Sequence, residues 1–211
     1  MKGLIKKDLF TLMAYKKSIL ILIVFMLVFA FVSKDVSFVP GFIGMLFVVI
    51  PLASFSYDNY SGFNDFALAL PISKRDIVKS KYIVALLFGL AGILLSIVIS
   101  LAAGLLQEKL PNLAETFVTA YVMAGVLVLF ISILFPLIFQ FGIEKGRFFI
   151  MFLALVPFLL ITLSGQNLSA ELLTQYAGLI EKLLYVIPPA SIVVFVLSYF
   201  VSRTIFERKE V

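Results

Sequence analysis

The most constraining feature of this sequence is a series of long stretches that contain no Asp, Glu, Lys or Arg. They cover residues 18–33, 36–57, 82–107, 116–143, 148–170 and 183–202. A helix needs about 20 mainly apolar residues to cross the hydrocarbon core of a bilayer, and all stretches but the first meet that length. The first has 16 residues, but the lysines beside it can extend it by reaching to the lipid headgroups. The stretches therefore predict six membrane-spanning helices.

The composition agrees with a lipid environment. Hydrophobic residues make up 63% of the chain and charged residues 14%, against roughly 45–50% and about 25% in soluble domains. A domain of this size exposes much of its surface, so a soluble fold could not hide that many apolar side chains. We predict an all-α membrane protein with a single transmembrane domain over residues 1–211. Its spans are expected at about 18–35, 38–57, 80–106, 117–140, 147–165 and 188–206.

The lysines and arginines are unevenly distributed between the segments that connect these spans. The N-terminal arm, the second loop, the fourth loop and the tail together carry 14 of them, and the other three loops carry one each, Lys34, Lys109 and Lys182. Positive charge in short loops marks the cytoplasmic side of a membrane protein. Both termini are therefore expected in the cytoplasm, which agrees with an even number of spans.

Several kinds of chemistry are disfavoured by what the sequence lacks. It contains no His and no Cys, so the commonest general base, the commonest metal ligand and all thiolates are missing. It has no phosphate-binding loop of the form G-x-x-x-x-G-K-[ST]. No charged residue lies deep in a predicted span, which argues against a proton-driven transporter. We expect no catalytic residue, metal site or cofactor in this chain, and no binding to nucleic acid.

Residues 1–17 are predicted to form an amphipathic helix that lies along the membrane surface. Ile5, Leu9, Leu12 and Met13 fall on one face at helical spacing. A helix of this kind places its basic residues against anionic headgroups. The lysines expected to anchor it are Lys2, Lys6, Lys7, Lys16 and Lys17. The alternative is a basic arm that only sets the topology.

The segment 58–71 is predicted to be a short helix on the cytoplasmic side. Asp58 is expected to cap its first turn and Pro71 to end it, and Ser73 opens the next helix. The segment exposes Asn64 and Asp65 beside aromatic residues, which suits a docking surface. The alternative is a helix that rests on lipid headgroups.

Two further patterns concern packing and the outer side. Gly92, Ser96, Ser100 and Gly104 recur at four-residue steps and form a stripe where another helix can approach closely. This stripe could pack within the bundle or against a second subunit, and the first interpretation is favoured. Residues 168–186 are predicted to form an external or re-entrant amphipathic helix, and the last span is expected to begin near Pro188.

Three short motifs resemble those of a known family. They are Lys6-Lys7-Asp8-Leu9, then Ser54-Phe55-Ser56-Tyr57-Asp58, then Leu70-Pro71-Ile72-Ser73-Lys74-Arg75-Asp76-Ile77-Val78 with Lys79-Ser80-Lys81-Tyr82 directly after it. The chain resembles the small six-span bacterial membrane subunits of ABC type-2 exporters, in which an S-Y-D/E segment leads to L-P-I-S-R/K and then K-Y. Relatives of this kind include exporters of phenol-soluble modulins and antimicrobial peptides.

The resemblance implies a fold and a set of partners. The N-terminal helix would be the family's elbow helix, and 58–71 its coupling helix, seated in a separate ABC ATP-binding subunit that holds ATP and Mg. The residues expected at that interface are Asp58, Asn59, Tyr60, Phe63, Asn64, Asp65 and Phe66. Many relatives carry an aromatic residue, often Trp, in this segment, and here Phe63 or Phe66 takes that place.

The resemblance also implies the cellular setting. The chain would be a multi-pass protein of the bacterial cytoplasmic membrane. A second permease subunit, identical or paralogous, would pair with it around the pathway. The cargo would be an amphipathic peptide or a lipophilic molecule moved out of the cell. The alternatives are the six-span substrate-binding subunit of a vitamin importer and a non-transporting membrane protein that sequesters peptides.

Overall fold

The computed structural model consists of helices joined by short connections. It describes residues 1–33, 39–106, 112–146, 148–153, 155 and 170–209. Along the described chain lie α1 (Lys2–Met13), α2 (Lys16–Ser33), α3 (Val39–Tyr60), α4 (Phe63–Ala69), α5 (Lys74–Leu106), α6 (Leu113–Phe141) and α8 (Ala170–Arg208). Residues 143–146 and 148–153, between α6 and α8, are helical as well. The described residues contain no strand. The predicted all-α fold class is confirmed.

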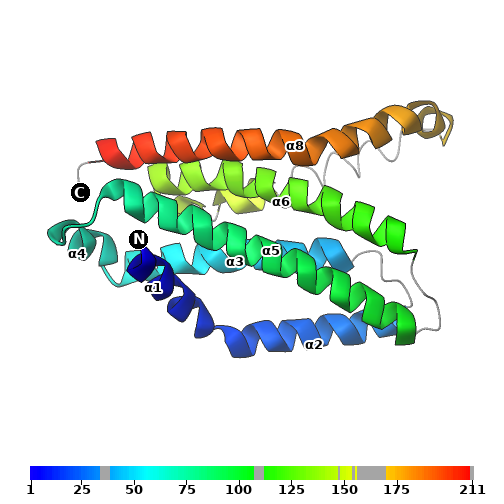
Figure 1. Cartoon of the computed structure of the whole chain (residues 1–211), viewed down its shortest axis with the longest axis horizontal. Helices are drawn as coiled ribbons and strands as arrows, with labels where there is room; N and C mark the ends of the chain where they lie inside the picture. Colours follow the sequence, from blue (N-terminus) through cyan, green and yellow to red (C-terminus); the bar gives the residue numbers. More distant parts are fainter. Residues whose placement is uncertain (34–38, 107–111, 147, 154, 156–169, 210–211) are drawn as a thin grey trace.

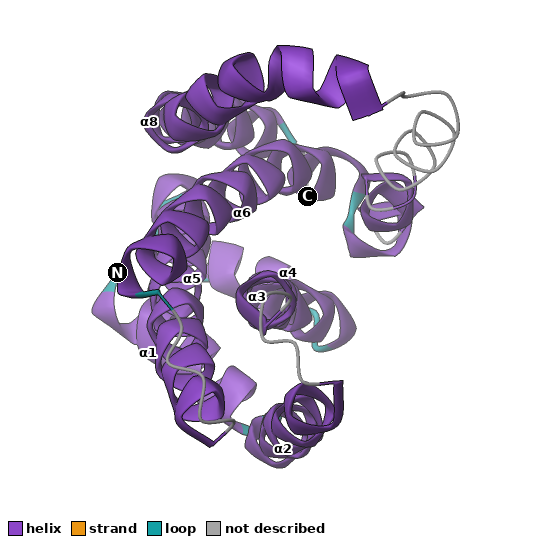
Figure 2. Ribbon diagram, turned by 90° about the vertical axis from the view of Figure 1, so that its right-hand side faces the viewer, coloured by secondary structure: helices purple, strands orange, loops and turns teal. Residues whose placement is uncertain are grey.

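The long helices lie side by side in an elongated bundle, and α5 is at its centre (Figure 1). α5 packs against α1, α2, α3, α6 and α8. In the view along the bundle, α5 lies beside both α3 and α6, while α2 lies at the periphery (Figure 2). The short helix α4 and both chain ends lie at the same end of the bundle (Figure 1). We call this the polar end; it comprises α1, α4, the first turns of α5 and the last turn of α8.

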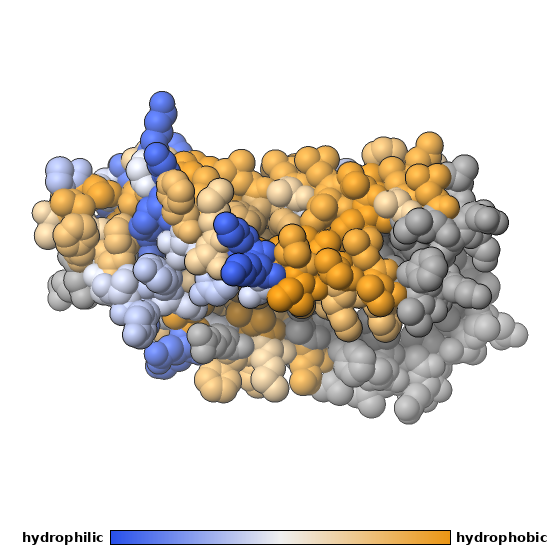
Figure 3. All heavy atoms as spheres, turned by 90° about the horizontal axis from the view of Figure 1, so that it is seen from below, coloured by the Kyte–Doolittle hydropathy of each residue, from blue (hydrophilic) through white to orange (hydrophobic). Residues whose placement is uncertain are grey.

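Side chains are segregated along the bundle in the way a membrane requires. On the face seen in Figure 3, hydrophilic atoms gather in the half that contains the polar end, and hydrophobic atoms dominate the other half. Four described helices are long and apolar enough to cross a membrane: Phe42–Tyr60, Lys74–Ala102, Leu113–Phe141 and Lys182–Arg208. The chain is therefore a membrane protein, because its apolar outer surface can be solvated only by lipid.

The described residues do not test all six spans expected from the sequence. α1 and the first part of α2 form a pair bent by 55°, which raises the candidate spans among the described residues from four to at most five. α2 reaches to Ser33 and matches the expected position of the first span. The predicted span at 147–165 lies largely outside the described residues, and so does the loop that carries Lys109.

The last helix is longer than predicted. A break was expected near Pro188, between an external helix at 168–186 and the last span. The structure instead has one helix, Ala170–Arg208, with Pro188 and Pro189 inside it. Prolines are tolerated in helices at membrane depth when neighbouring helices accommodate them. Here Pro188 packs against Gly125 of α6, where an added Cβ would come within 2.7 Å of the proline Cα.

The small-residue stripe of α5 lies inside the bundle. Gly92, Ser96, Ser100 and Gly104 are all buried. At Gly92 an added Cβ would lie 2.5 Å from the Cβ of Phe47, so the absence of a side chain lets α3 and α5 approach closely. This arrangement supports packing within the chain over a subunit interface.

Candidate functional site

Four charged side chains meet beneath the surface of the polar end. Lys81 is at their centre, with 4% of its side chain exposed, and its Nζ lies 2.9 Å from Asp8 Oδ1 and 2.5 Å from Asp58 Oδ2. Lys7 contacts the same two carboxylates from the rim, at 3.0 Å from Asp8 Oδ1 and in a short ion pair with Asp58. Two positive and two negative charges therefore balance one another. We call these four residues and Ser54 the Lys81 network.

Ser54 connects the network on its inner side. Its hydroxyl donates a hydrogen bond of 2.8 Å to Asp8 Oδ1 and accepts one from the ammonium of Lys81. Burying a charge is costly unless it is paired and hydrogen-bonded. Nearly all polar atoms of the network are paired or hydrogen-bonded. The exception in the network is Asp8 Oδ2, which is buried and has no hydrogen-bond partner among the described residues.

Asp8 is held in its charged form by this environment. α1 has 12 residues and is too short to cross a bilayer by itself. Burial alone would raise the pKa of the Asp8 carboxyl, but the positive charges of Lys81 and Lys7 and the hydrogen bonds from Lys81 and Ser54 outweigh it. They lower the pKa of Asp8 below its ordinary value.

The network gives α1 a buried face that the sequence did not predict. The sequence placed Ile5, Leu9, Leu12 and Met13 on one face toward the membrane, whereas the residues buried in the protein are Leu4, Asp8 and Leu12. Met13 is exposed instead. The burial of Asp8 could not be predicted from the helical period, because its partner Lys81 lies 73 positions away in the chain.

Lys7 is likewise not a simple membrane anchor. Lys2, Lys6, Lys16 and Lys17 are exposed, as a surface-anchoring role requires. Lys7 points inward to the network, and its ammonium lies 3.6 Å from the centre of the Phe63 ring in α4. It therefore connects α1 to the short helix by a cation–π contact.

The three motifs singled out from the sequence supply the network. Lys7 and Asp8 belong to the first motif, Ser54 and Asp58 to the second, and Lys81 to the third. The first motif is on α1, the second near the end of α3 and the third at the start of α5. The three motifs thus contribute residues to one cluster of charges. This could not be seen from the sequence, where the motifs lie far apart.

The residue after Lys81 faces the other side of the bundle. The hydroxyl of Tyr82 hydrogen-bonds to the hydroxyls of Ser198 and Ser202 on α8, at 2.7 Å each, and Ser198 donates to the carbonyl of Ser132 on α6 at 2.6 Å. The Tyr82 ring packs edge-on against Phe135 at 5.0 Å. Lys81 and Tyr82 together therefore join α5 to both sides of the bundle.

The segment between α3 and α5 turns back on itself through α4. α3 continues to Tyr60, and the turn is at Gly62, whose φ of +62° favours glycine. α4 ends at Ala69, and Leu70 is extended, as expected for a residue before proline. The Ser73 hydroxyl accepts a 3.1 Å hydrogen bond from the Asp76 N–H and caps α5, as the sequence predicted.

Asp58 differs from its predicted role. It was expected to cap the short helix and to contact a partner, but it lies inside α3, is 3% exposed and is paired with two lysines. Its charge is satisfied across helices, so α3 runs on past it. Asp58 forms buried ion pairs beneath the turn between α3 and α4 and does not form part of the exposed surface.

The other residues predicted at the interface differ in how exposed their side chains are. Tyr60 is 91% and Phe66 61% exposed, and Asn59 is exposed as well. Phe63 is partly buried against the bundle core. The side chains of Asn64 and Asp65 lie outside the described part of the structure. Tyr60 and Phe66 thus form an exposed aromatic surface at the tip of the polar end.

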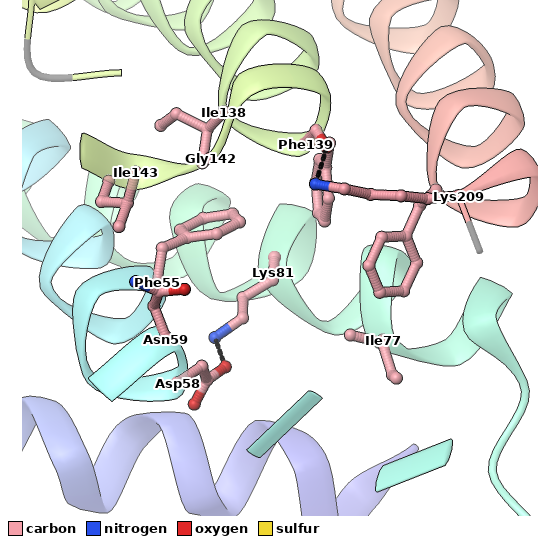
Figure 4. A pocket seen from close by; sticks show the side chains of 11 residues that line it. Phe55, Asp58, Asn59, Ile77, Lys81, Ile138, Phe139, Gly142, Ile143 and Lys209 are labelled. Carbon is pink, nitrogen blue, oxygen red and sulfur yellow. Dashed lines mark hydrogen bonds and ion pairs between the residues drawn. The ribbon is translucent and has the colours of Figure 1, made fainter. Parts of the chain in front are cut away.

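A small cavity lies beside the network. Its volume is about 90 Å³, and Asp58, Asn59 and Lys81 form its polar side. Phe55, Phe139 and Phe206 form part of its apolar side. Figure 4 shows Lys81 reaching from α5 to Asp58 across this space, while Lys209 turns away to the carbonyl of Phe139.

The start of α5 is also tied to the end of α8. Arg75 Nε lies 2.6 Å from Glu207 Oε1, and Arg203 Nε lies 3.0 Å from the same oxygen. Lys74 donates a 2.7 Å hydrogen bond to the carbonyl of Lys209. These contacts are exposed, so water and salt weaken them.

Comparison with known proteins identifies a family. The family described as "ABC-2 family transporter protein" matches residues 3–207. The match covers all three motifs and nearly all the described helices. Neither a curated protein nor a solved structure gives a significant match.

Proposed function

Because the chain belongs to the ABC-2 family of transporter membrane proteins, it is the membrane subunit of an ABC transporter, and we propose that it works as the permease half of an exporter. An ABC ATP-binding subunit is the partner that this family implies. The family membership favours this function over the substrate-binding subunit of a vitamin importer and over a peptide-sequestering protein.

We propose that α4 docks in a cleft of the ATP-binding subunit, which holds ATP and Mg. The observation that carries this proposal is an exposed aromatic pair at the connection between α3 and α5: Tyr60 at the end of α3 and Phe66 on the short helix α4. Large aromatic side chains in a partner's pocket supply much of the binding energy of an interface. Asn59 adds an exposed polar group, and Phe63 contributes from its half-buried position.

The proposed cargo is an amphipathic peptide or a lipophilic molecule. The bundle offers many exposed apolar and aromatic side chains along its length, and its described charges concentrate at the polar end. Charged solutes would find no counter-charge along such a surface. ATP binding would close the partner subunits, push on α4, and shift α3 and α5 so that the pathway opens outward.

The proposed setting is the bacterial cytoplasmic membrane, with both termini in the cytoplasm and a second permease subunit, identical or paralogous, beside this one. The basic residues at the polar end support the orientation, because positive charge is retained on the cytoplasmic side. α1 would then lie along the inner surface as the elbow helix, with its exposed lysines against anionic headgroups.

The test is copurification from the native host with a tag at the C-terminus. Tyr60→Ala/Phe66→Ala should lose the ATP-binding subunit while the membrane subunit still elutes as a folded species. The matched control is Phe148→Ala, a similarly exposed aromatic residue in another segment, which should retain the subunit. Both substitutions leave Asp58 and the Lys81 network intact.

Two outcomes would contradict the proposal. If the wild-type chain carries no ATP-binding subunit in a well-folded preparation, the permease function fails. If the double variant retains that subunit and transports normally, α4 is not the docking helix. A small molecule or peptide that copurifies with the chain alone would favour one of the alternative functions.

A further inference from the structure

The Lys81 network lies at the base of the loop that carries α4. Asp58 lies two residues before the end of α3, and Lys81 is in the second turn of α5. The chain between them contains the whole of α4. The ion pair of Asp58 with Lys81 therefore closes the loop that presents α4, and it couples α3 to α5 at the base of that loop.

α1 is held by the same charges although it is distant in sequence. Asp8 shares the ammonium of Lys81, and Lys7 shares the carboxylate of Asp58. Lys7 also contacts the Phe63 ring of α4. α1 is thus attached both to the base of the loop and to the short helix that the loop presents.

The burial of these charges makes the attachment stiff. Water cannot replace a buried partner, so separating one ion leaves an uncompensated charge at a large cost. An exposed pair such as Arg75 with Glu207 can open at little cost. Apolar side chains could hold three helices together with similar stability, but ion pairs of this geometry also specify one relative position.

We propose that the Lys81 network locks α1, the end of α3 and the start of α5 into one rigid unit, with Lys81 as its positioning residue. The role of this unit in transport rests on the proposed function. In that function, a push on α4 would move the unit as a whole and carry α1 along the membrane surface. Without the network, α1, α3 and α5 would no longer move together, and ATP hydrolysis would continue without transport.

The experiment measures the distance between α1 and α5 in the complex with the ATP-binding subunit. The chain has no native cysteine, so it can be labelled at Lys6→Cys and Lys79→Cys alone, both exposed. Complexes in which the labelled chain is diluted with an excess of unlabelled permease subunit report the distance within one chain by pulsed electron paramagnetic resonance. In the otherwise wild-type chain we expect one narrow distribution that stays unchanged between the nucleotide-free and ATP-trapped states. A shift on ATP trapping would overturn the rigid unit.

The critical variant is Asp8→Asn/Lys81→Met, which removes one charge of each sign. The remaining Lys7 and Asp58 still balance, so this pair should fold better than either single substitution. We expect a broadened α1–α5 distance, retained binding of the ATP-binding subunit, and at least a tenfold loss of transport per ATP hydrolysed. The control pair Arg75→Gln/Glu207→Gln, on the exposed ion pair, should match the wild type.

The outcomes separate a positioning role from a purely structural one. If the Asp8→Asn/Lys81→Met chain keeps a narrow distance and couples normally, the network serves only stability and the inference is wrong. If that variant does not fold, the wild-type distances in the nucleotide-free and ATP-trapped states still test whether the unit is rigid. If no ATP-binding subunit binds the wild type, the proposed function fails, while the nucleotide-free distances still test the rigid unit.

Discussion

At the scale of single residues, close approaches between helices depend on glycines, which have no side chain. Gly92 faces Phe47 across the contact between α5 and α3, and Gly125 faces Pro188 across the contact between α6 and α8. Both positions need a small residue because the neighbouring atoms are a Cβ or main-chain atoms, which cannot move aside as the end of a flexible side chain can. Gly89 on the same helix as Gly92 has open space around it.

Gly92→Ala is therefore expected to destabilise the bundle. The added methyl group would overlap the Cβ of Phe47 and separate α3 from α5, at a cost of about 1–3 kcal/mol. The control, Gly89→Ala, adds the same group where nothing obstructs it and should leave the stability equal or slightly higher. Thermal unfolding of the purified protein in detergent measures both. Equal midpoints for the two variants would show that the close approach is not needed.

At the scale of elements, α5 holds the two sides of the bundle together through adjacent residues. Lys81 reaches α1 and α3, and Tyr82 reaches α8. Residues next to each other on a helix point about 100° apart, so a K-Y pair can serve two neighbours at once. This explains why α5 contacts more of the fold than the outer helices do.

Tyr82→Phe tests the link from α5 to α8. It keeps the aromatic ring but removes the hydroxyl that bonds Ser198 and Ser202, and buried hydroxyls on α8 lose their partner. With about 0.5–1.5 kcal/mol for each hydrogen bond, we expect a loss of about 1–3 kcal/mol in unfolding free energy. Tyr199→Phe is the matched control, since this ring lies in the same aromatic cluster and its hydroxyl makes no hydrogen bond to the residues that the structure describes.

A stability of Tyr82→Phe equal to that of Tyr199→Phe would contradict this role for the hydroxyl. Denaturant titration followed by tyrosine fluorescence or circular dichroism would resolve a difference of this size. The arrangement of α6 and α8 would then depend on ring packing and on the contact of Pro188 with Gly125 alone.

At the scale of the whole molecule, the fold places both termini and α4 at one end and the start of α6 at the other (Figure 1). This arrangement agrees with the charge distribution along the chain. In a membrane, the end with the exposed lysines is expected on the cytoplasmic side.

Single cysteines introduced into the cysteine-free chain test this orientation. Lys6→Cys in α1 and Glu207→Cys near the end of α8 should react with a membrane-impermeant maleimide only in inside-out vesicles. Glu115→Cys at the start of α6, which is exposed, should react only in right-side-out vesicles. Labelling of Lys6→Cys and Glu115→Cys from the same side would contradict the proposed topology.

Much of the fold follows from local patterns in the sequence. Charge-free stretches predicted α2, α3, α5 and α6, because a backbone in lipid must satisfy its own hydrogen bonds and forms helices. The cap at Ser73 and the end of α4 before Pro71 also depend only on neighbouring residues. The exposure of Tyr60 and Phe66 follows from their place in the connection between two spans.

The Lys81 network could be decided only by the tertiary structure. Sequence periodicity does not connect Asp8 with Lys81, because a charged side chain is expected in water unless its partner is known. The two acidic partners of Lys81, Asp58 and Asp8, lie 23 and 73 positions before it in the chain, and packing alone brings them within hydrogen-bond distance. The continuity of α8 through Pro188 also depends on tertiary packing, because Gly125 on α6 leaves space for the proline. Local chemistry therefore determined which segments are helical, and the contacts between helices decided which charges are buried.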